Sequence, residues 1–237
     1  GPYLCRMSEA VHAMFSDIAP KYDLTNSVLS LGIHHMWRKA TVKASGARVG
    51  SSVLDCATGT GDLALTFKRT VGASGKVVGT DFNADMLSFA PAKARRKGLD
   101  VAFEVADAMK LPYADATFDV ASISFGIRNV DSPAVALGEM ARVVRPGGRV
   151  VVLEFGQPRG LIGLTYRWYS KHIIPFIGGL LTGHREAYEY LPTTAAAFPC
   201  REDFLDVMRS TGRLTDCSYR ELTGGIAFLY VGTVIPR

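Results

Sequence analysis

Three carboxylates in the first half of the chain have the type and spacing to bind a nucleoside. Asp55, Asp81 and Asp107 each stand at or just beyond the end of a short apolar run with the composition of a β-strand. A carboxylate at such a position can accept hydrogen bonds from ribose hydroxyls or from the exocyclic amine of adenine. Three of them at successive strand ends therefore predict a ligand that contains adenosine.

A glycine loop separates the first two carboxylates. Asp55 is followed by Ala57, Gly59 and Gly61, and Asp81 stands 20 residues after Gly61. Small residues let a ligand approach the backbone, and the helix N-terminus expected after the loop adds to the binding site. Dinucleotide-binding proteins share this loop, and a plain strand–turn–helix connection would explain its glycines but not the three carboxylates. The pattern favours a nucleoside with an amino-acid tail, and S-adenosylmethionine is such a ligand.

These residues need a sheet that brings the strand ends together. Short apolar runs alternate with helix-like stretches from 50 to 156, which indicates an α/β fold whose parallel strands are covered by helices on both faces. Ligands of such sheets bind at the carboxyl ends of the strands. The runs expected to be strands are 52–56, 76–81, 101–105, 118–124 and 149–154, with helices at 63–69 and 133–144 and a helix N-cap at Asn83.

The composition is that of an ordinary globular chain. Of 237 residues, 48% are hydrophobic and 21% charged, and the net charge is +5, which excludes disordered, collagenous and coiled-coil classes. The four cysteines form no Cys-x-x-Cys pair, so no metal site or disulfide framework is predicted and a reducing, cytoplasmic setting is expected. Gly1-Pro2 resembles a protease-cleavage scar and Met7 a natural start, so residues 1–6 are expected to be a disordered tag.

Longer segments of the chain resemble one known family. They are similar to the ubiquinone/menaquinone biosynthesis C-methyltransferases, class I S-adenosylmethionine-dependent enzymes that include demethylmenaquinone methyltransferases. The Tyr-Asp segment at 14–24 and the Ser-Phe-Gly-Ile-Arg-Asn segment at 124–129 are far more specific than the glycine loop, which every class I methyltransferase shares. The other matching segments are 31–38, 55–62, 145–148, 153–155, 188–192, 198–199 and 222–226.

The resemblance implies a fold, a reaction and a set of contacts. The fold is Rossmann-like, with a seven-stranded, mostly parallel sheet whose last strand is antiparallel, a helical cap at 1–48, and a domain at 49–237 with a helical insertion at about 157–200. The reaction is C-methylation of a polyprenylated quinol, with demethylmenaquinol to menaquinol favoured, and a homodimer is expected. The residues that the loop pattern or the resemblance assigns to the cofactor are Asp55, Ala57, Gly59, Thr60, Gly61, Asp81, Phe82, Asp107, Ala108 and Ser124.

Methylation of a quinol ring carbon needs a cation or a base near a ring hydroxyl, because phenolate formation activates the adjacent carbon. Arg128 follows the fourth strand and is expected to stabilise the phenolate, with Asn129 orienting the same oxygen; the alternative for Arg128 is a structural ion pair with an acid such as Asp131. Tyr22 is expected either to close the pocket over the sulfonium or to anchor the cap. His184 is a weaker candidate for the base.

The insertion is rich in aromatic and basic residues. Leu161, Leu164 and Trp168 fall at helical spacing, which fits either a helix that buries them on the domain or an amphipathic surface that receives an isoprenoid tail and contacts the inner face of the membrane. The dispersed basic excess does not indicate a nucleic-acid track. Two other functions stay open: methylation of another small aromatic compound, and binding of S-adenosylmethionine without catalysis in a larger assembly.

Overall fold

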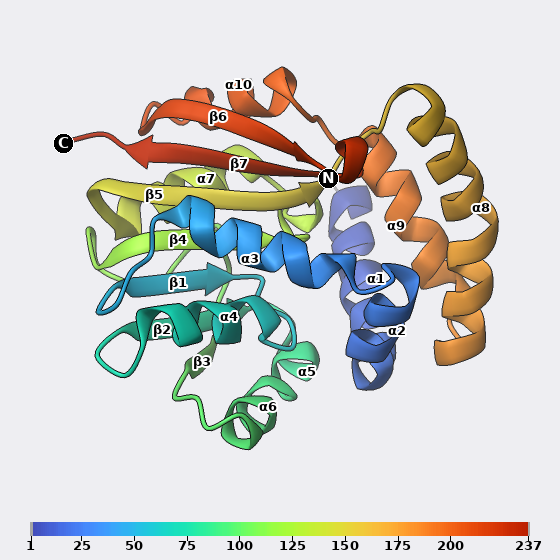
Figure 1. Ribbon diagram of the computed structural model, residues 1–237, viewed down its shortest axis with the longest axis horizontal. Helices are drawn as coiled ribbons and strands as arrows, with labels where there is room; N and C mark the ends of the chain where they lie inside the picture. Colours follow the sequence, from blue (N-terminus) through green and yellow to red (C-terminus); the bar gives the residue numbers. More distant parts are fainter. Residues whose placement is uncertain (1, 237) are drawn as a thin grey trace.

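The computed structural model describes residues 2–236, which fold around a seven-stranded sheet (Figure 1). The strand order is β3-β2-β1-β4-β5-β7-β6, and β7 runs antiparallel to both of its neighbours while β1 to β5 pair in parallel. The expected mostly parallel sheet with an antiparallel last strand is therefore confirmed. The strands are β1 (Ser52–Cys56), β2 (Lys76–Asp81), β3 (Ala102–Val105), β4 (Phe118–Ser124), β5 (Val144–Phe155), β6 (Leu214–Leu222) and β7 (Ala227–Val234).

The strand order reverses between β1 and β4. The chain passes outward from β1 to β3 and then returns to β4 on the other side of β1, where Cys56 of β1 pairs with Ile123 of β4. The carboxyl ends of these strands lie at the right-hand edge of the sheet in Figure 1. Open parallel sheets bind ligands at such a reversal point.

Helices cover both faces of the sheet because successive strand residues alternate between two apolar clusters. Leu54 and Val152 pack in one cluster with Phe204, whereas Val53 packs in the other with Phe67. The first cluster holds α7 (Pro133–Val143) and α10 (Glu202–Ser210), and the second holds α3 (Ile33–Ser45) and α4 (Asp62–Val71). The short helices α5 (Ala84–Leu87) and α6 (Ala90–Arg96) follow β2.

The N-cap expected at Asn83 is confirmed. Its side-chain oxygen accepts a hydrogen bond from the Met86 amide at 3.0 Å, which satisfies one of the free N–H groups at the start of α5. The Asn83 side-chain amide also donates to the His12 carbonyl at 3.0 Å. Asn83 therefore caps α5 and also connects it by a hydrogen bond to the first helix of the chain.

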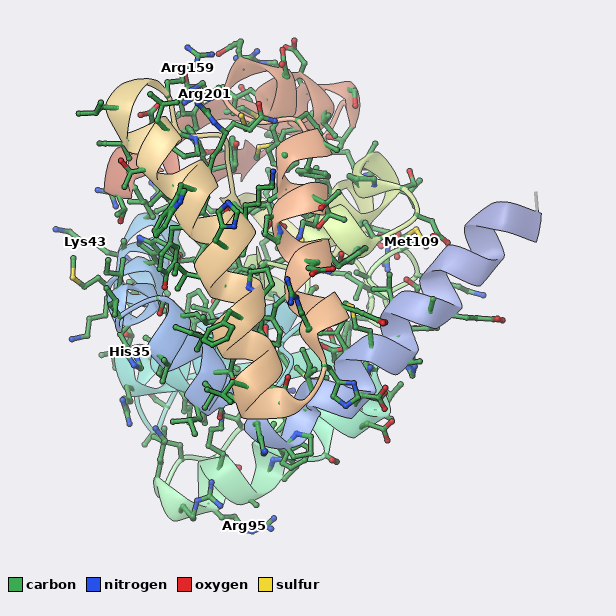
Figure 2. All side chains as sticks on the ribbon, turned by 90° about the vertical axis from the view of Figure 1, so that its right-hand side faces the viewer. His35, Lys43, Arg95, Met109, Arg159 and Arg201 are labelled. Atoms are coloured by element: carbon green, nitrogen blue, oxygen red, sulfur yellow. The ribbon has the colours of Figure 1, made fainter. Side chains whose placement is uncertain are left out.

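Four helices form a cap over the carboxyl edge of the sheet (Figures 1 and 2). They are α1 (Pro2–Ile18), α2 (Tyr22–Leu29), α8 (Gly160–Thr182) and α9 (Arg185–Ala197), so the helical N-terminal part and the helical insertion are present. Helix α1 begins at Pro2, so it includes residues 2–6 of the segment expected to be a tag, and Gly1 lies outside the described residues.

Helix α8 is continuous through Pro175 and packs closely on α9. A Cβ atom at Gly178 would lie 2.3 Å from the ring of Tyr188, so glycine lets the buried tyrosine approach the helix backbone. No helix within residues 2–236 is long and apolar enough to cross a membrane.

The outer face of α8 is apolar and exposed. Leu161 is 81% exposed, and Leu164 and Trp168 are each 60% exposed. The interpretation that the insertion buries these three side chains on the domain is therefore wrong. Phe176 and Leu180 continue the exposed row along the helix.

Candidate active site

Two cavities meet at the carboxyl edge of the sheet. The large cavity, of about 580 Å³, lies under the cap helices, and the small cavity, of about 250 Å³, lies beside β2 and β3. Both are lined by the loop after β1 and by the segment after β4, at the point where the strand order reverses. The residues that line both cavities are Tyr22, Ala57, Gly59, Ser124 and Phe125.

The backbone at this junction is strained. Ala57 and Phe125 have φ angles of 47° and 54°, in the left-handed region that residues with a side chain seldom adopt. Such conformations cost roughly 1–3 kcal/mol each and concentrate at ligand sites, where the surrounding structure holds them in place. The two cavities therefore meet where the backbone is held in two left-handed conformations.

The small cavity holds the carboxylates expected to bind ribose and adenine. Asp81 accepts hydrogen bonds from the Gly59 and Asn83 amides, both at 2.8 Å, and burial still raises its pKa above the usual range although these bonds oppose the effect. Asp107 accepts from the Met109 amide at 2.8 Å. Phe82 and Ala108, two further predicted cofactor residues, also line this cavity.

Two residues assigned to the cofactor lie outside both cavities. Asp55 is fully buried, and its two carboxylate oxygens accept hydrogen bonds from the hydroxyls of Thr58 at 2.6 Å and Ser122 at 2.7 Å. Gly61 is the N-cap residue just before α4, with φ of 89°, and a Cβ atom there would lie 3.0 Å from Phe103. Both residues shape the loop from beneath instead of facing a ligand, which corrects their expected role.

Helix α1 closes one side of the small cavity. Val11, His12 and Phe15 line its wall, and the ring of His12 contacts the exposed Phe82 edge-on with 5.9 Å between ring centroids. The hydrogen bond from Asn83 to the His12 carbonyl holds the helix in this position. The N-terminal cap is therefore part of the site.

The large cavity has mainly apolar walls, and a buried ion pair stands at the junction. Arg128 Nη1 lies 2.6 Å from Glu154 Oε1, and both side chains are 1% exposed. The same Nη1 donates to the Phe125 carbonyl at 3.0 Å, and the guanidinium lies over the ring of Phe155. The partner of Arg128 is thus Glu154 at the end of β5, and the suggested pair with Asp131 is absent from the ion pairs of the described residues.

The guanidinium retains donors for a ligand. Within residues 2–236 the hydrogen bonds of the Arg128 side chain use Nε and Nη1, while Nη2 takes part in none of them. Arg128 lines the large cavity, so its remaining N–H groups are available to an oxygen of a bound molecule. Asn129 lines the small cavity and accepts a hydrogen bond from the Tyr190 hydroxyl at 3.3 Å.

Three tyrosines near Arg128 stay protonated at neutral pH. Burial raises the pKa of Tyr166 to about 12 and also raises the pKa values of Tyr22 and Tyr190. Tyr22 lines both cavities and packs against Phe15 of α1, with 6.5 Å between ring centroids. Tyr22 therefore lies between helix α1 and the junction of the two cavities, and its two expected roles stay predictions.

The structure does not bring His184 to the site. It precedes α9 at the turn after α8, is exposed, and lies outside the described lining of both cavities. The imidazole in the large cavity is His34, whose pKa is lowered to about 4 by burial and by the positive charges of Arg38 and His35. Sequence reasoning missed His34 and Glu154, although both stand in segments that carry the family resemblance.

Comparison with known proteins agrees with this geometry. The model of the ubiE/COQ5 methyltransferase family matches residues 5–234. The chain is 60% identical to the ubiquinone/menaquinone biosynthesis C-methyltransferase UbiE of Bdellovibrio bacteriovorus, over 95% of this chain and 96% of that protein. It is 47% identical to the demethylmenaquinone methyltransferase of Deinococcus radiodurans, over 94% of this chain and 92% of that protein.

Solved structures show the same fold at low identity. The crystal structure of a SAM dependent methyltransferase from Aquifex aeolicus superimposes with a TM-score of 0.63 at 20% identity, covering 84% of this chain and 89% of that one. Since the family model spans nearly the whole chain, this protein belongs to the ubiE/COQ5 methyltransferase family.

Proposed function

We propose that this protein transfers a methyl group from S-adenosylmethionine to a ring carbon of a polyprenylated quinol, with demethylmenaquinol as the favoured substrate. The observation that carries the proposal is the junction of a small cavity, lined by Asp81 and Asp107, with a large and mainly apolar cavity, with Arg128 buried beside it. A hydrophobic substrate fits the mainly apolar walls of the large cavity, and the relatives named as UbiE and demethylmenaquinone methyltransferase support the substrate class.

The small cavity fits the adenosine part of the cofactor. Asp81 and Asp107 present carboxylate oxygens that can accept from the ribose hydroxyls and the adenine amine, and the Ala108 amide can donate to the ring. Gly59, Thr60 and Ser124 lie between the two cavities or beside the junction, where the rest of the molecule would pass. S-adenosylmethionine supplies an electrophilic methyl group on a sulfonium.

The chain's own residues activate and align the quinol. Arg128 Nη2 donates to the ring oxygen and stabilises the phenolate next to the carbon that is methylated, as a preorganised charge does in a dry site. Glu154 holds the guanidinium in place. Asn129 lines only the small cavity, so it lies on the cofactor side of the junction and not beside the quinol oxygen. Tyr22 covers the junction and excludes water, which favours close approach of the reacting atoms.

Methyl transfer to separate quinols tests this function. The protein is incubated with methyl-labelled S-adenosylmethionine and a reduced demethylmenaquinone analogue, a demethoxybenzoquinol analogue, another small aromatic phenol or RNA. Label in the naphthoquinol is the expected result. Tight cofactor binding with no label in either quinol would refute the proposal and favour a non-catalytic partner.

We extend the proposal to the surface that receives the substrate. The exposed apolar row on α8, formed by Leu161, Leu164, Trp168, Phe176 and Leu180, ends at the mouth of the large cavity, since Leu161 lines that cavity. Helix α8 lies on the side of the molecule that faces the viewer in Figure 2. A lipid-soluble quinol can therefore pass from an apolar surface directly into an apolar cavity.

The charges around this row complement an anionic membrane surface. Helix α8 contains no Asp or Glu, whereas Arg167 and Lys171 are exposed on it and Arg159 precedes it. Exposed basic residues beside apolar ones are typical of helices that lie in the membrane interface. The occupant proposed for the α8 face is therefore the surface of a membrane that contains anionic lipids.

Vesicle sedimentation tests the membrane contact. Trp168→Glu should lower binding to phosphatidylglycerol vesicles at least tenfold, whereas Val49→Glu, a matched change at an exposed residue before β1, should not. Equal binding by both variants would contradict the proposal. The homodimer implied by the resemblance stays a prediction; if sedimentation showed a dimer that Trp168→Glu dissociates, the α8 face would be an interface between copies instead.

A further inference from the structure

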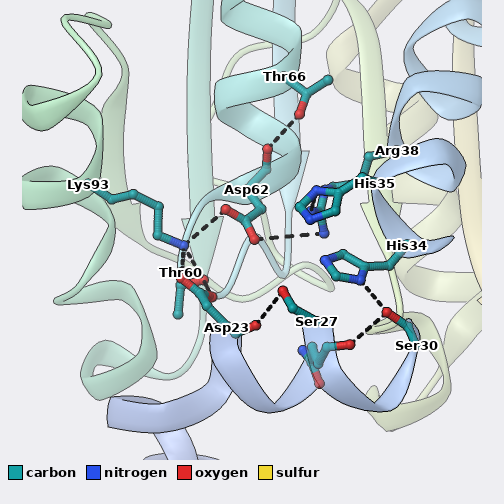
Figure 3. A network of polar contacts seen from close by, with 11 residues as sticks. Asp23, Ser27, Ser30, His34, His35, Arg38, Thr60, Asp62, Thr66 and Lys93 are labelled. Atoms are coloured by element: carbon teal, nitrogen blue, oxygen red, sulfur yellow. Dashed lines mark hydrogen bonds and ion pairs between the residues drawn. The ribbon is translucent and has the colours of Figure 1, made fainter. Parts of the chain in front are cut away.

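A cluster of charged side chains stands at one end of the large cavity, and the proposed reaction does not use it (Figure 3). Asp62 begins α4, Arg38 projects from α3, and Lys93 from α6 reaches both Asp62 and Asp23 of α2. Asp62 and Arg38 line the cavity wall. Charged side chains at the wall of a mainly apolar cavity are costly in free energy unless they are fully paired, so their presence there suggests that they serve a ligand.

Lys93 has a structural role within this cluster. It forms ion pairs with Asp23 and with Asp62, the latter at 3.0 Å, and donates to the Thr60 hydroxyl at 2.9 Å. Thr60 in turn donates to Asp23 at 2.6 Å. These contacts fasten α2 to the glycine loop and fully occupy the ammonium group.

Arg38, in contrast, is short of partners. Its side chain is 14% exposed, and among the described residues its hydrogen bonding is limited to the contact of Nη2 with His35 Nδ1 at 2.8 Å. Nη1 is 3.7 Å from Asp62 Oδ2, too far for a hydrogen bond. A guanidinium has enough N–H groups to hold a carboxylate with two parallel bonds, so Arg38 has donors to spare.

Asp62 faces this guanidinium with one free oxygen. Its Oδ1 accepts from Lys93 at 3.0 Å, while its Oδ2 has no contact closer than the 3.7 Å to Arg38 among the polar contacts of the described residues. Burial acts to raise the pKa of Asp62, but the charges of Lys93 and Arg38 outweigh it and the pKa is lowered. An unsatisfied cation and an ionised carboxylate thus stand side by side without a hydrogen bond.

This arrangement complements the zwitterion of an α-amino acid. A carboxylate can bind the free N–H groups of Arg38, and the adjacent ammonium can donate to Asp62 Oδ2. The cluster begins two residues after Thr60, at the end of the glycine loop that connects the two cavities. A ligand with its adenosine in the small cavity would reach Arg38 and Asp62 by following this loop.

We propose that Arg38 and Asp62 bind the carboxylate and the ammonium of the methionyl tail of the cofactor. The inference rests on the proposed function, in which the adenosine of S-adenosylmethionine occupies the small cavity. It assigns the amino-acid end of the cofactor to α3 and to the first residue of α4, the two helices that cover one face of the sheet.

Calorimetric titration with two ligands tests this inference. S-adenosylhomocysteine carries the amino-acid tail, and 5′-methylthioadenosine lacks it. Arg38→Met should weaken binding of S-adenosylhomocysteine roughly 10- to 100-fold, as expected for loss of hydrogen bonds to a charged group, and leave binding of 5′-methylthioadenosine unchanged. Lys39→Met removes the same charge from an exposed neighbour on α3 and should change neither affinity.

A second variant and a second ligand complete the test. Decarboxylated S-adenosylhomocysteine should bind the wild type and Arg38→Met equally, whereas Asp62→Asn should weaken it because the ammonium contact is lost. Equal losses for both original ligands in Arg38→Met, or no loss for either, would overturn the inference. Failure of the wild type to bind S-adenosylhomocysteine at all would instead refute the proposed function.

Discussion

The buried pair of Arg128 and Glu154 allows a catalytic role to be separated from a structural one. Both side chains are 1% exposed and their charged atoms lie 2.6 Å apart. Arg128→Met leaves the Glu154 carboxylate buried without its cation, which costs about 3–5 kcal/mol of unfolding free energy. For a chain of this length that corresponds to a fall in the melting temperature of roughly 6–20 °C.

The double variant Arg128→Met/Glu154→Gln removes both charges. The glutamine amide oxygen can still accept from the Phe155 amide, which donates to Glu154 at 2.8 Å in the wild type. Most of the lost stability should therefore return, because no unpaired charge remains buried. The turnover number should stay lower by roughly 100- to 1,000-fold, the usual effect of removing one preorganised charge from a developing anion.

Thermal unfolding and initial rates of methyl transfer measure the two quantities on the same samples. Arg145→Met is the matched control: its pair with Asp119 is 48% and 43% exposed, so its loss should change stability by less than about 1 kcal/mol. Recovery of turnover in the double variant to within tenfold of the wild type would refute the reasoning. Arg128 would then serve only to neutralise Glu154.

Three further outcomes follow from local geometry. His34 has a pKa of about 4 in the folded protein, so it stays neutral there, while the unfolded chain takes up a proton below about pH 6.5. The free energy of unfolding should therefore fall as the pH drops from about 6.5 to 4. In urea titrations His34→Gln should flatten this pH dependence, and an unchanged dependence would contradict the assignment. Gly178→Ala should destabilise the protein by about 1–3 kcal/mol because the added methyl group overlaps with Tyr188, whereas Gly138→Ala in α7, with open space around it, should stabilise the protein slightly. Calorimetry measures both changes in stability, and changes of the same sign would contradict the reasoning. Asn83→Ala should lower stability by about 1 kcal/mol because the N-cap of α5 is lost. It should also increase amide hydrogen exchange in α1, because the hydrogen bond to the His12 carbonyl is lost, and unaltered exchange would mean that this bond does not stabilise α1.

The strand ends, and the position of two carboxylates beside the small cavity, could be predicted because their signals are local. The carboxyl ends of parallel strands meet at one edge, so Asp81 and Asp107 had to lie near the glycine loop once the strands were recognised. The same logic failed for Asp55, because a residue inside a strand end can point either into the sheet or out of it. Its full burial under Thr58 and Ser122 depends on side-chain packing that spacing alone does not describe.

The contacts of the cap could not be predicted because they join residues far apart in the chain. Asp23 and Lys93 pair across 70 positions, and the apolar row of α8 has the same helical spacing whether it is buried or exposed. Periodicity identifies a face of a helix but not what covers it. His184 and His34 were equally plausible as residue types, and only the three-dimensional placement distinguishes an exposed turn from a cavity wall.

The ion-pair partner of Arg128, Glu154, was not predicted, but it could have been deduced from the register of the strands. Ser124 of β4 pairs with Leu153 of β5, so residues just after Ser124 must lie beside Glu154. Asp131 is closer in sequence, but the short 3₁₀ helix from Ile127 to Asn129 and the extended Val130 carry it to the small cavity. Parallel pairing brings equivalent strand ends together whatever their separation along the chain, whereas a turn can send near neighbours to opposite sides. A search for charge partners in parallel sheets should therefore begin with the register of adjacent strands rather than with the nearest acid in the sequence.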